Sequence, residues 1–141
     1  MDISEWQKFA TFACNHENKL HDEYNQHNAI ATSLNVSELK VASVLIPIWF
    51  RSSNSPEVIL TVRSASLSTY AGQVCFPGGQ RDLSDRDEQA TALRELEEEI
   101  GISIDKITLS GQLPAFRTIS GFQVTPVLGV LRSTVSLGDF M

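Results

Sequence analysis

The chain has 141 residues, of which 42% are hydrophobic and 20% are charged, and its formal net charge is -6. This length and composition favour a single domain with one core, over residues 1–141. The negative charge argues against a broad surface for nucleic acid or anionic membrane, but a phosphorylated small molecule stays open because a divalent metal ion inverts the local charge.

No membrane partner is expected, because no apolar run approaches the ~20 residues that span a bilayer. Residues 1–12 lack a basic region followed by an apolar stretch, so they do not resemble a secretion signal. Cys14 and Cys75 form no paired-cysteine motif, as expected for free thiols in a reducing compartment. These features predict a cytoplasmic protein.

Residues 1–39 are expected to precede the core as a helix and a connector. Ser4 and Gln7 resemble a capping box, and apolar residues then recur at helical spacing, which predicts a helix over about 4–23. The core, 40–141, begins with a β-rich strand over 40–50, where Pro47 indicates an edge position or a bulge.

Further strands and one helix are expected in the rest of the core. The polar turn "SSNSPE" and the segment "VILTVRS" (58–64) complete a hairpin, and "QVCF" is a short strand that ends at Pro-Gly-Gly. Gly101 terminates a helix over about 86–100. Strands over 106–116 and 122–132 follow, so the pattern predicts a mixed α/β sandwich.

The expected helix carries four glutamates in the stretch "RELEEEIG". Residues at i, i+3 and i+4 share a helical face, so Glu95, Glu98 and Glu99 project together and Glu97 points away. Like charges at this spacing destabilise a helix by roughly 0.2–0.5 kcal/mol per pair, and only Arg94 offsets them locally. A solvated acidic face is the structural alternative. Hard cations such as Mg²⁺ or Mn²⁺ prefer oxygen ligands, so the face also suits a metal site.

The loop before the helix supports the metal site. Gly78 and Gly79 permit close approach of the backbone to a ligand. Asp82, Asp85 and Asp87 add oxygen ligands near the start of the helix. A glycine pair, an acidic loop and a glutamate helix in this order favour a functional site over a simple surface helix.

The segment from Gly79 to Ile102 resembles the Nudix box, in which a glycine leads to Arg-Glu-apolar-x-Glu-Glu-x-Gly-apolar. The interval from Gly79 to Arg94 is one residue longer than the general pattern. Arg86 stands where that pattern has a glutamate, so Asp85 and Asp87 are both candidates for its role. The matching residues are Arg94, Glu95, Leu96, Glu98, Glu99, Gly101 and Ile102.

The segment before the box resembles the signature of the coenzyme A diphosphatases of the Nudix superfamily. It departs from that signature at Ser68 and Tyr70, where a basic residue and a histidine are commoner. The residues that match are Thr61, Arg63, Ser64, Leu67, Gly72, Gln73, Phe76, Pro77, Gly78, Gly79 and Asp82.

The resemblance implies an α/β/α sandwich with a mixed β-sheet and a catalytic box helix. It implies hydrolysis of coenzyme A, a small-molecule nucleotide, to 4′-phosphopantetheine and adenosine 3′,5′-bisphosphate, with Mg²⁺ or Mn²⁺. The expected metal ligands are the three glutamates of the shared face, Glu95, Glu98 and Glu99, with the Gly78 carbonyl.

The resemblance also suggests roles for other residues. Glu98 is the candidate base and Arg94 holds a neighbouring glutamate, although a surface ion pair is the alternative for Arg94. Gly78, Gly79 and Arg63 are expected to bind substrate, and Arg63 has a structural role as its alternative.

Other functions remain open. A Nudix hydrolase of ADP-ribose or of a nucleoside triphosphate, and a non-catalytic Nudix-like binding module, are the alternatives. Members of the family usually continue beyond the strand at 122–132, so a C-terminal truncation is considered. If the chain is truncated, the apolar residues of the strand at 122–132 are expected to form an exposed patch. Such a patch predicts a homo-oligomer or a less stable chain.

Overall fold

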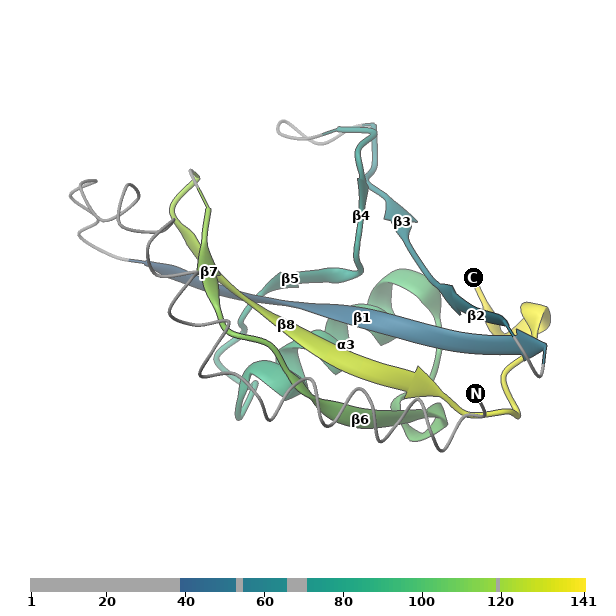
Figure 1. The fold of residues 1–141 in the computed structure, drawn as a ribbon. Helices are drawn as coiled ribbons and strands as arrows, with labels where there is room; N and C mark the ends of the chain where they lie inside the picture. Colours follow the sequence, from purple (N-terminus) through teal and green to yellow (C-terminus); the bar gives the residue numbers. More distant parts are fainter. Residues whose placement is uncertain (1–38, 53–54, 66–70, 119) are drawn as a thin grey trace.

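The computed structural model describes residues 39–52, 55–65, 71–118 and 120–141 (Figure 1). The helix expected over 4–23 and most of the connector lie outside these residues. Among the described residues, no helix is both long and apolar enough to cross a membrane. In chain order the elements are β1 (Lys40–Ser52), β2 (Ser55–Val58), β3 (Thr61–Val62), β4 (Val74–Cys75), β5 (Gly78–Gln80), α3 (Glu88–Ile100), η2 (Ile104–Lys106), β6 (Ile107–Gln112), β7 (Phe116–Arg117), β8 (Phe122–Leu131) and η3 (Leu137–Asp139).

The described strands form a mixed six-stranded sheet in which β1 and β8 are the long members. These two strands pair in parallel, with Leu45 opposite Val127, and the main order is β2-β1-β8-β6. The other pairings in the sheet are antiparallel, as β5 pairs with β1 and β7 pairs with β8. The α/β class and the mixed sheet are therefore confirmed.

Pro47 does not mark an edge strand, because β1 lies inside the sheet between β8 and β2. The register of β1 with β2 does shift, but between Trp49 and Ser52, beyond the proline. One side of β1 pairs with β5 at residues 42–44 and with β2 from Ile48 onward. The Pro47 carbonyl faces this side and accepts a hydrogen bond from the N–H of Ile59 at 3.1 Å. The proline thus lies between the stretch of β1 that pairs with β5 and the stretch that pairs with β2, where it accepts this bond but cannot return one, because it has no N–H.

The other strand predictions need smaller corrections. The hairpin of β1 with β2 is confirmed, but the single strand expected over 58–64 is divided into β2 and β3. β3 and β4 form a separate two-stranded ladder that extends away from the sheet (Figure 1). The strand expected over 106–116 is divided into β6 and β7.

The main core lies between α3 and the sheet. Leu96 of the helix, Leu45 of β1 and Val127 of β8 are fully buried in one cluster, so the helix is fixed by its apolar face. The opposite face of the sheet is also apolar and buried, at Ile48 and Val130.

The C-terminal segment returns to the end of α3. The Phe140 ring lies 5.2 Å from that of Trp49, and the N–H of Met141 donates to the Ile100 carbonyl at 3.0 Å. Asp139 pairs with Lys106. The prediction of an exposed apolar patch on β8 is wrong. Of the five apolar residues, Leu128 is half-buried and the other four are buried: Val124, Val127, Val130 and Leu131.

Candidate active site

Helix α3 is capped at both ends, which fixes the position of its glutamates. The Asp87 carboxylate accepts a hydrogen bond from the Ala90 N–H at 2.8 Å, so Asp87 is the N-cap residue. Gly101 ends the helix with φ 76°, a conformation that favours glycine, and its N–H donates to the Glu97 carbonyl. The buried Leu96 faces the core, so the glutamate face is turned away from the core.

Arg94 connects two of the three glutamates. Its Nη1 donates to Glu95 Oε1 at 2.9 Å and to Glu98 Oε2 at 3.1 Å. Its Nη2 also donates to the carbonyl of Gln80 at 3.1 Å, which links the helix to β5. The prediction that Arg94 holds a neighbouring glutamate is in agreement with these contacts, although the Glu98 side chain is 59% exposed.

Asp85 is the loop acid that faces Arg94. Arg94 Nε and Nη2 donate to its two carboxylate oxygens, and the side chain of Asp85 is only 5% exposed. The hydrogen bonds from Arg94 hold the pKa of Asp85 well below its usual range. Asp85 and Asp87, which the sequence left as alternatives, thus have separate tasks as the Arg94 partner and the helix cap.

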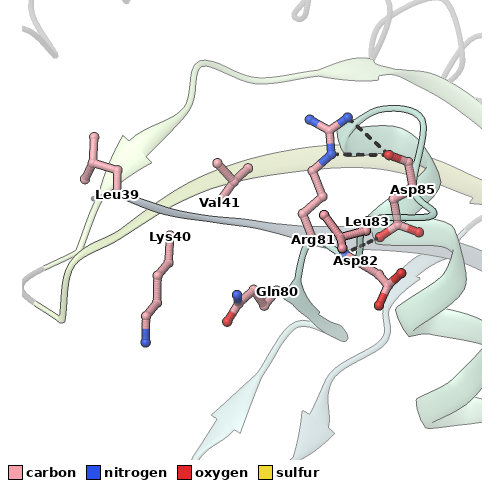
Figure 2. Close-up of a pocket in the computed structure, with 8 residues that line it drawn as sticks. All are labelled: Leu39, Lys40, Val41, Gln80, Arg81, Asp82, Leu83 and Asp85. Carbon is pink, nitrogen blue, oxygen red and sulfur yellow. Dashed lines mark hydrogen bonds between the residues drawn. The ribbon is translucent and has the colours of Figure 1, made fainter. Parts of the chain in front are cut away.

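The loop around Asp85 is itself ordered by hydrogen bonds. Figure 2 shows Arg81 donating through Nε and Nη2 to the Asp85 carbonyl, while the Asp82 N–H donates to the Asp85 carboxylate at 2.9 Å. These residues line a pocket of about 450 Å³, in which Lys40 approaches from β1. The loop thus holds Asp85 from both its main chain and its side chain.

Gly78 and Gly79 are required by close packing. A methyl group at Gly79 would overlap with the Glu95 carboxylate, and one at Gly78 would overlap with the β1 backbone at Ser43 and Val44. The structure thus brings Glu95 directly against the Gly-Gly strand β5. The sequence placed these glycines at the end of the strand before them, and their pairing with β1 as a strand of their own places them beside the glutamate face.

Glu99 contacts a different set of groups. Thr61 Oγ1 on β3 donates to Glu99 Oε2 at 3.4 Å. Burial and the neighbouring Glu95 carboxylate raise the pKa of Glu99, and hydrogen bonding from the Gly78 backbone and from Thr61, together with the Arg63 charge, opposes this rise. Negative charge is therefore concentrated between Glu95 and Glu99.

The donor set suits a hard divalent cation, but the described residues contain no group of three acidic, histidine or cysteine side chains gathered to bind one ion. Glu95 and Glu99 repel each other beside Gly78–Gly79, and a cation between them would relieve this repulsion. Glu98, which Arg94 also contacts, is the more exposed of the two glutamates that this arginine holds. The fit to a metal ion therefore rests first on Glu95 and Glu99.

A second, larger pocket of about 740 Å³ opens beside the Gly-Gly strand. Arg63 lines it, and the Nε of this arginine is buried without a hydrogen-bond partner among the described residues. Thr118 and Phe122, near the β7–β8 turn, also line it. A buried N–H donor in a pocket of this size, close to the acidic pair, suits an anionic small molecule.

The model of the NUDIX domain matches residues 40–135 of the chain. The chain belongs to the Nudix family. The Nudix hydrolase NudL of Pectobacterium atrosepticum is 46% identical over 96 residues, which cover 68% of this chain and 49% of that protein. NudL of Escherichia coli is 47% identical over 90 residues, 64% of this chain and 46% of that protein. The chain thus matches about half the length of these curated relatives.

Solved Nudix structures share the fold. The Ap4A hydrolase of C. elegans in a binary complex has a TM-score of 0.56 at 21% identity, over 67% of this chain and 68% of that one. The NUDIX domain of Shewanella oneidensis NrtR complexed with ADP ribose has a TM-score of 0.53 at 20% identity, over 71% and 64%. At these identities the likeness shows the fold alone.

The contact between Thr61 and the Nudix-box glutamates was missed from the sequence, although Thr61 was part of the matched signature. A single hydroxyl in the apolar stretch "VILTV" was the available signal, but no local pattern shows which helix it approaches. Ser68 and Tyr70, where the signature departs from its subfamily, lie outside the described residues. The Gly78 carbonyl as a metal ligand remains a prediction.

Proposed function

We propose that this Nudix chain hydrolyses a nucleoside diphosphate-linked small molecule, most specifically coenzyme A or a derivative, in a reaction that requires Mg²⁺ or Mn²⁺. The observation that carries the proposal is the acidic pair Glu95 and Glu99 beside the Gly78–Gly79 strand, where Glu95 lies against Gly79 and its charge helps to raise the pKa of Glu99. Carboxylates held this close repel each other, and a bound cation would relieve the repulsion.

Glu95, Glu98 and Glu99 are the proposed metal ligands, with the Gly78 carbonyl as an addition that the family resemblance implies. A metal ion held there would supply charge neutralisation of the diphosphate and activation of a water molecule. Glu95 is fixed by Arg94 and by its contact with Gly79. Arg94 acts as a positioning residue, because its contacts are with carboxylates and with a carbonyl oxygen.

Glu98 is the proposed general base. Its carboxylate is exposed, so solvent reaches it, and the hydrogen bond from Arg94 Nη1 fixes its direction. A base needs a free carboxylate oxygen within hydrogen-bond reach of the water it deprotonates. As Arg94 occupies Oε2, Oε1 is the oxygen proposed to accept the proton.

Arg63 is proposed to bind a substrate phosphate. Its buried Nε–H lacks a partner among the described residues, and it lines the 740 Å³ pocket together with Gly78 and Gly79. A guanidinium binds phosphate oxygens through parallel N–H donors, and this pairing would satisfy the unpaired Nε–H. The pocket volume lies within the range of small-molecule sites.

Coenzyme A is favoured over other nucleotides by the signature that precedes the Nudix box, which includes Thr61, Arg63 and Gln73. Hydrolysis of ADP-ribose is the alternative, and its support is weaker, since it comes from a fold neighbour that is complexed with ADP ribose. A nucleoside triphosphate is the other alternative substrate. A non-catalytic module is disfavoured because all three glutamates of the box are present.

A product analysis tests this proposal. The chain is incubated with coenzyme A, ADP-ribose and deoxynucleoside triphosphates in Mg²⁺ or Mn²⁺, and products are identified by mass spectrometry. We expect 4′-phosphopantetheine and adenosine 3′,5′-bisphosphate from coenzyme A. Turnover of ADP-ribose or triphosphates alone would support the alternative substrates, and no turnover of any compound would contradict hydrolysis.

A further inference from the structure

Glu99 differs from Glu95 and Glu98 in the hydrogen-bond donors that contact its carboxylate. Arg94 donates to Glu95 and to Glu98, at 2.9 and 3.1 Å. The hydrogen bonds to Glu99 come instead from outside the helix, from the Thr61 hydroxyl at 3.4 Å and from the Gly78 backbone. A long glutamate side chain loses rotamer entropy when it is fixed, so a ligand of this kind needs a partner that orients it.

The position of Thr61 follows from the alternation of its strand segment. Val58, Leu60 and Val62 point outward and are 52%, 49% and 69% exposed, while Ile59 packs against the core. Thr61 shares the inward side with Ile59, because successive side chains of a strand alternate. The segment thus presents one inward hydroxyl, and this hydroxyl meets the Nudix-box helix.

The backbone and a second side chain fix Thr61 in turn. It is paired with Cys75 in the β3–β4 ladder, and its Oγ1 lies 3.4 Å from both the carbonyl oxygen and the Sγ of Cys75. The hydroxyl has one proton and several lone pairs. The Glu99 carboxylate is a stronger acceptor for this proton than the Cys75 carbonyl, because it is charged, and the hydroxyl can in turn accept from the Cys75 thiol. These contacts link β4 through β3 to the helix.

We propose that Thr61 is a positioning residue, whose hydroxyl orients the Glu99 carboxylate for divalent-metal binding. The inference rests on the proposed function only in taking Glu99 as a metal ligand. Hydrogen-bond partners of ligating carboxylates typically contribute 10–100-fold to metal affinity or activity. Because the contact is a single bond near the distance limit, the effect is expected at the lower end of that range.

The test measures Mn²⁺ binding directly, from the electron paramagnetic resonance signal of free Mn²⁺, with no substrate present. Thr61→Val keeps the shape and β-branching and removes the hydroxyl, whereas Thr61→Ser keeps the hydroxyl. We expect Thr61→Val to weaken Mn²⁺ binding about 10-fold and Thr61→Ser to stay within about 3-fold of wild type. Thr108→Val, at an exposed position of β6, is the matched control and should bind as wild type.

A double variant separates positioning from a general effect on the fold. In a Glu99→Gln background, Thr61→Val should cause no further loss of Mn²⁺ affinity, because its route to the metal has been removed. Equal loss in both backgrounds, equal loss in Thr61→Val and Thr61→Ser, or no loss in Thr61→Val would each overturn the inference. Wild type that binds no Mn²⁺ would overturn it too. If the Mn²⁺ series holds and no substrate is hydrolysed, the proposed reaction fails while the role of Thr61 stands.

Discussion

Arg94 and Asp85 form a two-point ion pair between the box helix and the loop before it, with Nε 3.1 Å from Oδ1 and Nη2 3.0 Å from Oδ2. The same guanidinium continues to Glu95 and Glu98 through Nη1. One arginine thereby joins the loop to two members of the glutamate face. The carboxylate of Asp85 sets the orientation in which Arg94 meets the glutamates.

Asp85→Asn should destabilise the fold and also lower activity. The amide keeps the size of the side chain but removes the charge that receives the Arg94 hydrogen bonds, which costs about 2 kcal/mol. Without this anchor the Arg94 side chain would shift toward Glu95 and Glu98 and change the orientation of their carboxylates. Chemical denaturation and an assay at saturating metal measure the two effects, with the exposed Asp105→Asn as control. Stability equal to wild type would show that the pair carries no net energy.

Gly78→Ala and Gly79→Ala should have different consequences although the residues are neighbours. A methyl group at Gly78 meets the β1 backbone, which has no room to move, so about 1–3 kcal/mol of stability should be lost. At Gly79 the methyl group meets the end of the flexible Glu95 side chain, so the fold should survive and metal-dependent activity should fall. Thermal melts and activity of both variants, measured side by side, check this. The same pattern in both would contradict the packing argument.

Glu99→Gln should abolish most activity without a loss of stability in the absence of metal. Burial and Glu95 raise the pKa of Glu99, so its ionisation opposes folding as the pH rises above about 4.5. A neutral amide removes that cost, and the melting temperature in EDTA should equal or exceed that of wild type. Activity should fall about 100-fold or more, since a direct ligand contributes at least as much as its hydrogen-bond partners.

Glu97→Gln is the matched control for Glu99→Gln. Glu97 is exposed and lies on a different side of the helix, so its neutralisation should leave activity within about 2-fold of wild type. Comparable losses in the two variants would indicate a general effect of helix charge instead of a defined ligand face.

Acid should weaken the contact between the C-terminal segment and the body of the protein. The Lys106 ammonium and the Ser136 donors lower the pKa of Asp139 to about 2, so the folded state favours its ionised form. This contribution to stability is complete above the ordinary value of 3.8 and is lost as the pH falls from there toward 2. Asp139→Asn should therefore melt lower at pH 6 and lose less on acidification than wild type. If the melting temperature of Asp139→Asn falls on acidification as steeply as that of wild type, Asp139 does not cause the acid sensitivity.

Local sequence signals predicted the helix and its acidic face well. The 3.6-residue periodicity and the terminating Gly101 act within a few residues, so they could be found without tertiary information. Asp87 was expected to be an oxygen ligand, and its role as the N-cap was missed. The prediction began at 86 and the helix begins at Glu88, a difference that reflects the position of its N-cap. The three ligand candidates were named because their spacing places them on one face.

The remaining features depend on contacts between distant segments. A Gly-Gly pair has low strand propensity, and β5 forms because β1 offers it an unpaired side. The choice between Asp85 and Asp87 depends on the path of the loop, which no local pattern specifies. The burial of the apolar residues of β8 was missed for the same reason. Val135 and Phe140, which follow β8 in the sequence, pack against the core only in the folded chain.

The most direct test of the account is a ³¹P NMR time course of coenzyme A with the full chain in Mg²⁺, followed by addition of excess EDTA. We expect the diphosphate resonances to be replaced by those of two phosphomonoesters, EDTA to stop this conversion, and Glu99→Gln to show almost none. Conversion that continues in EDTA, or intact coenzyme A with wild-type protein in both Mg²⁺ and Mn²⁺, would contradict it.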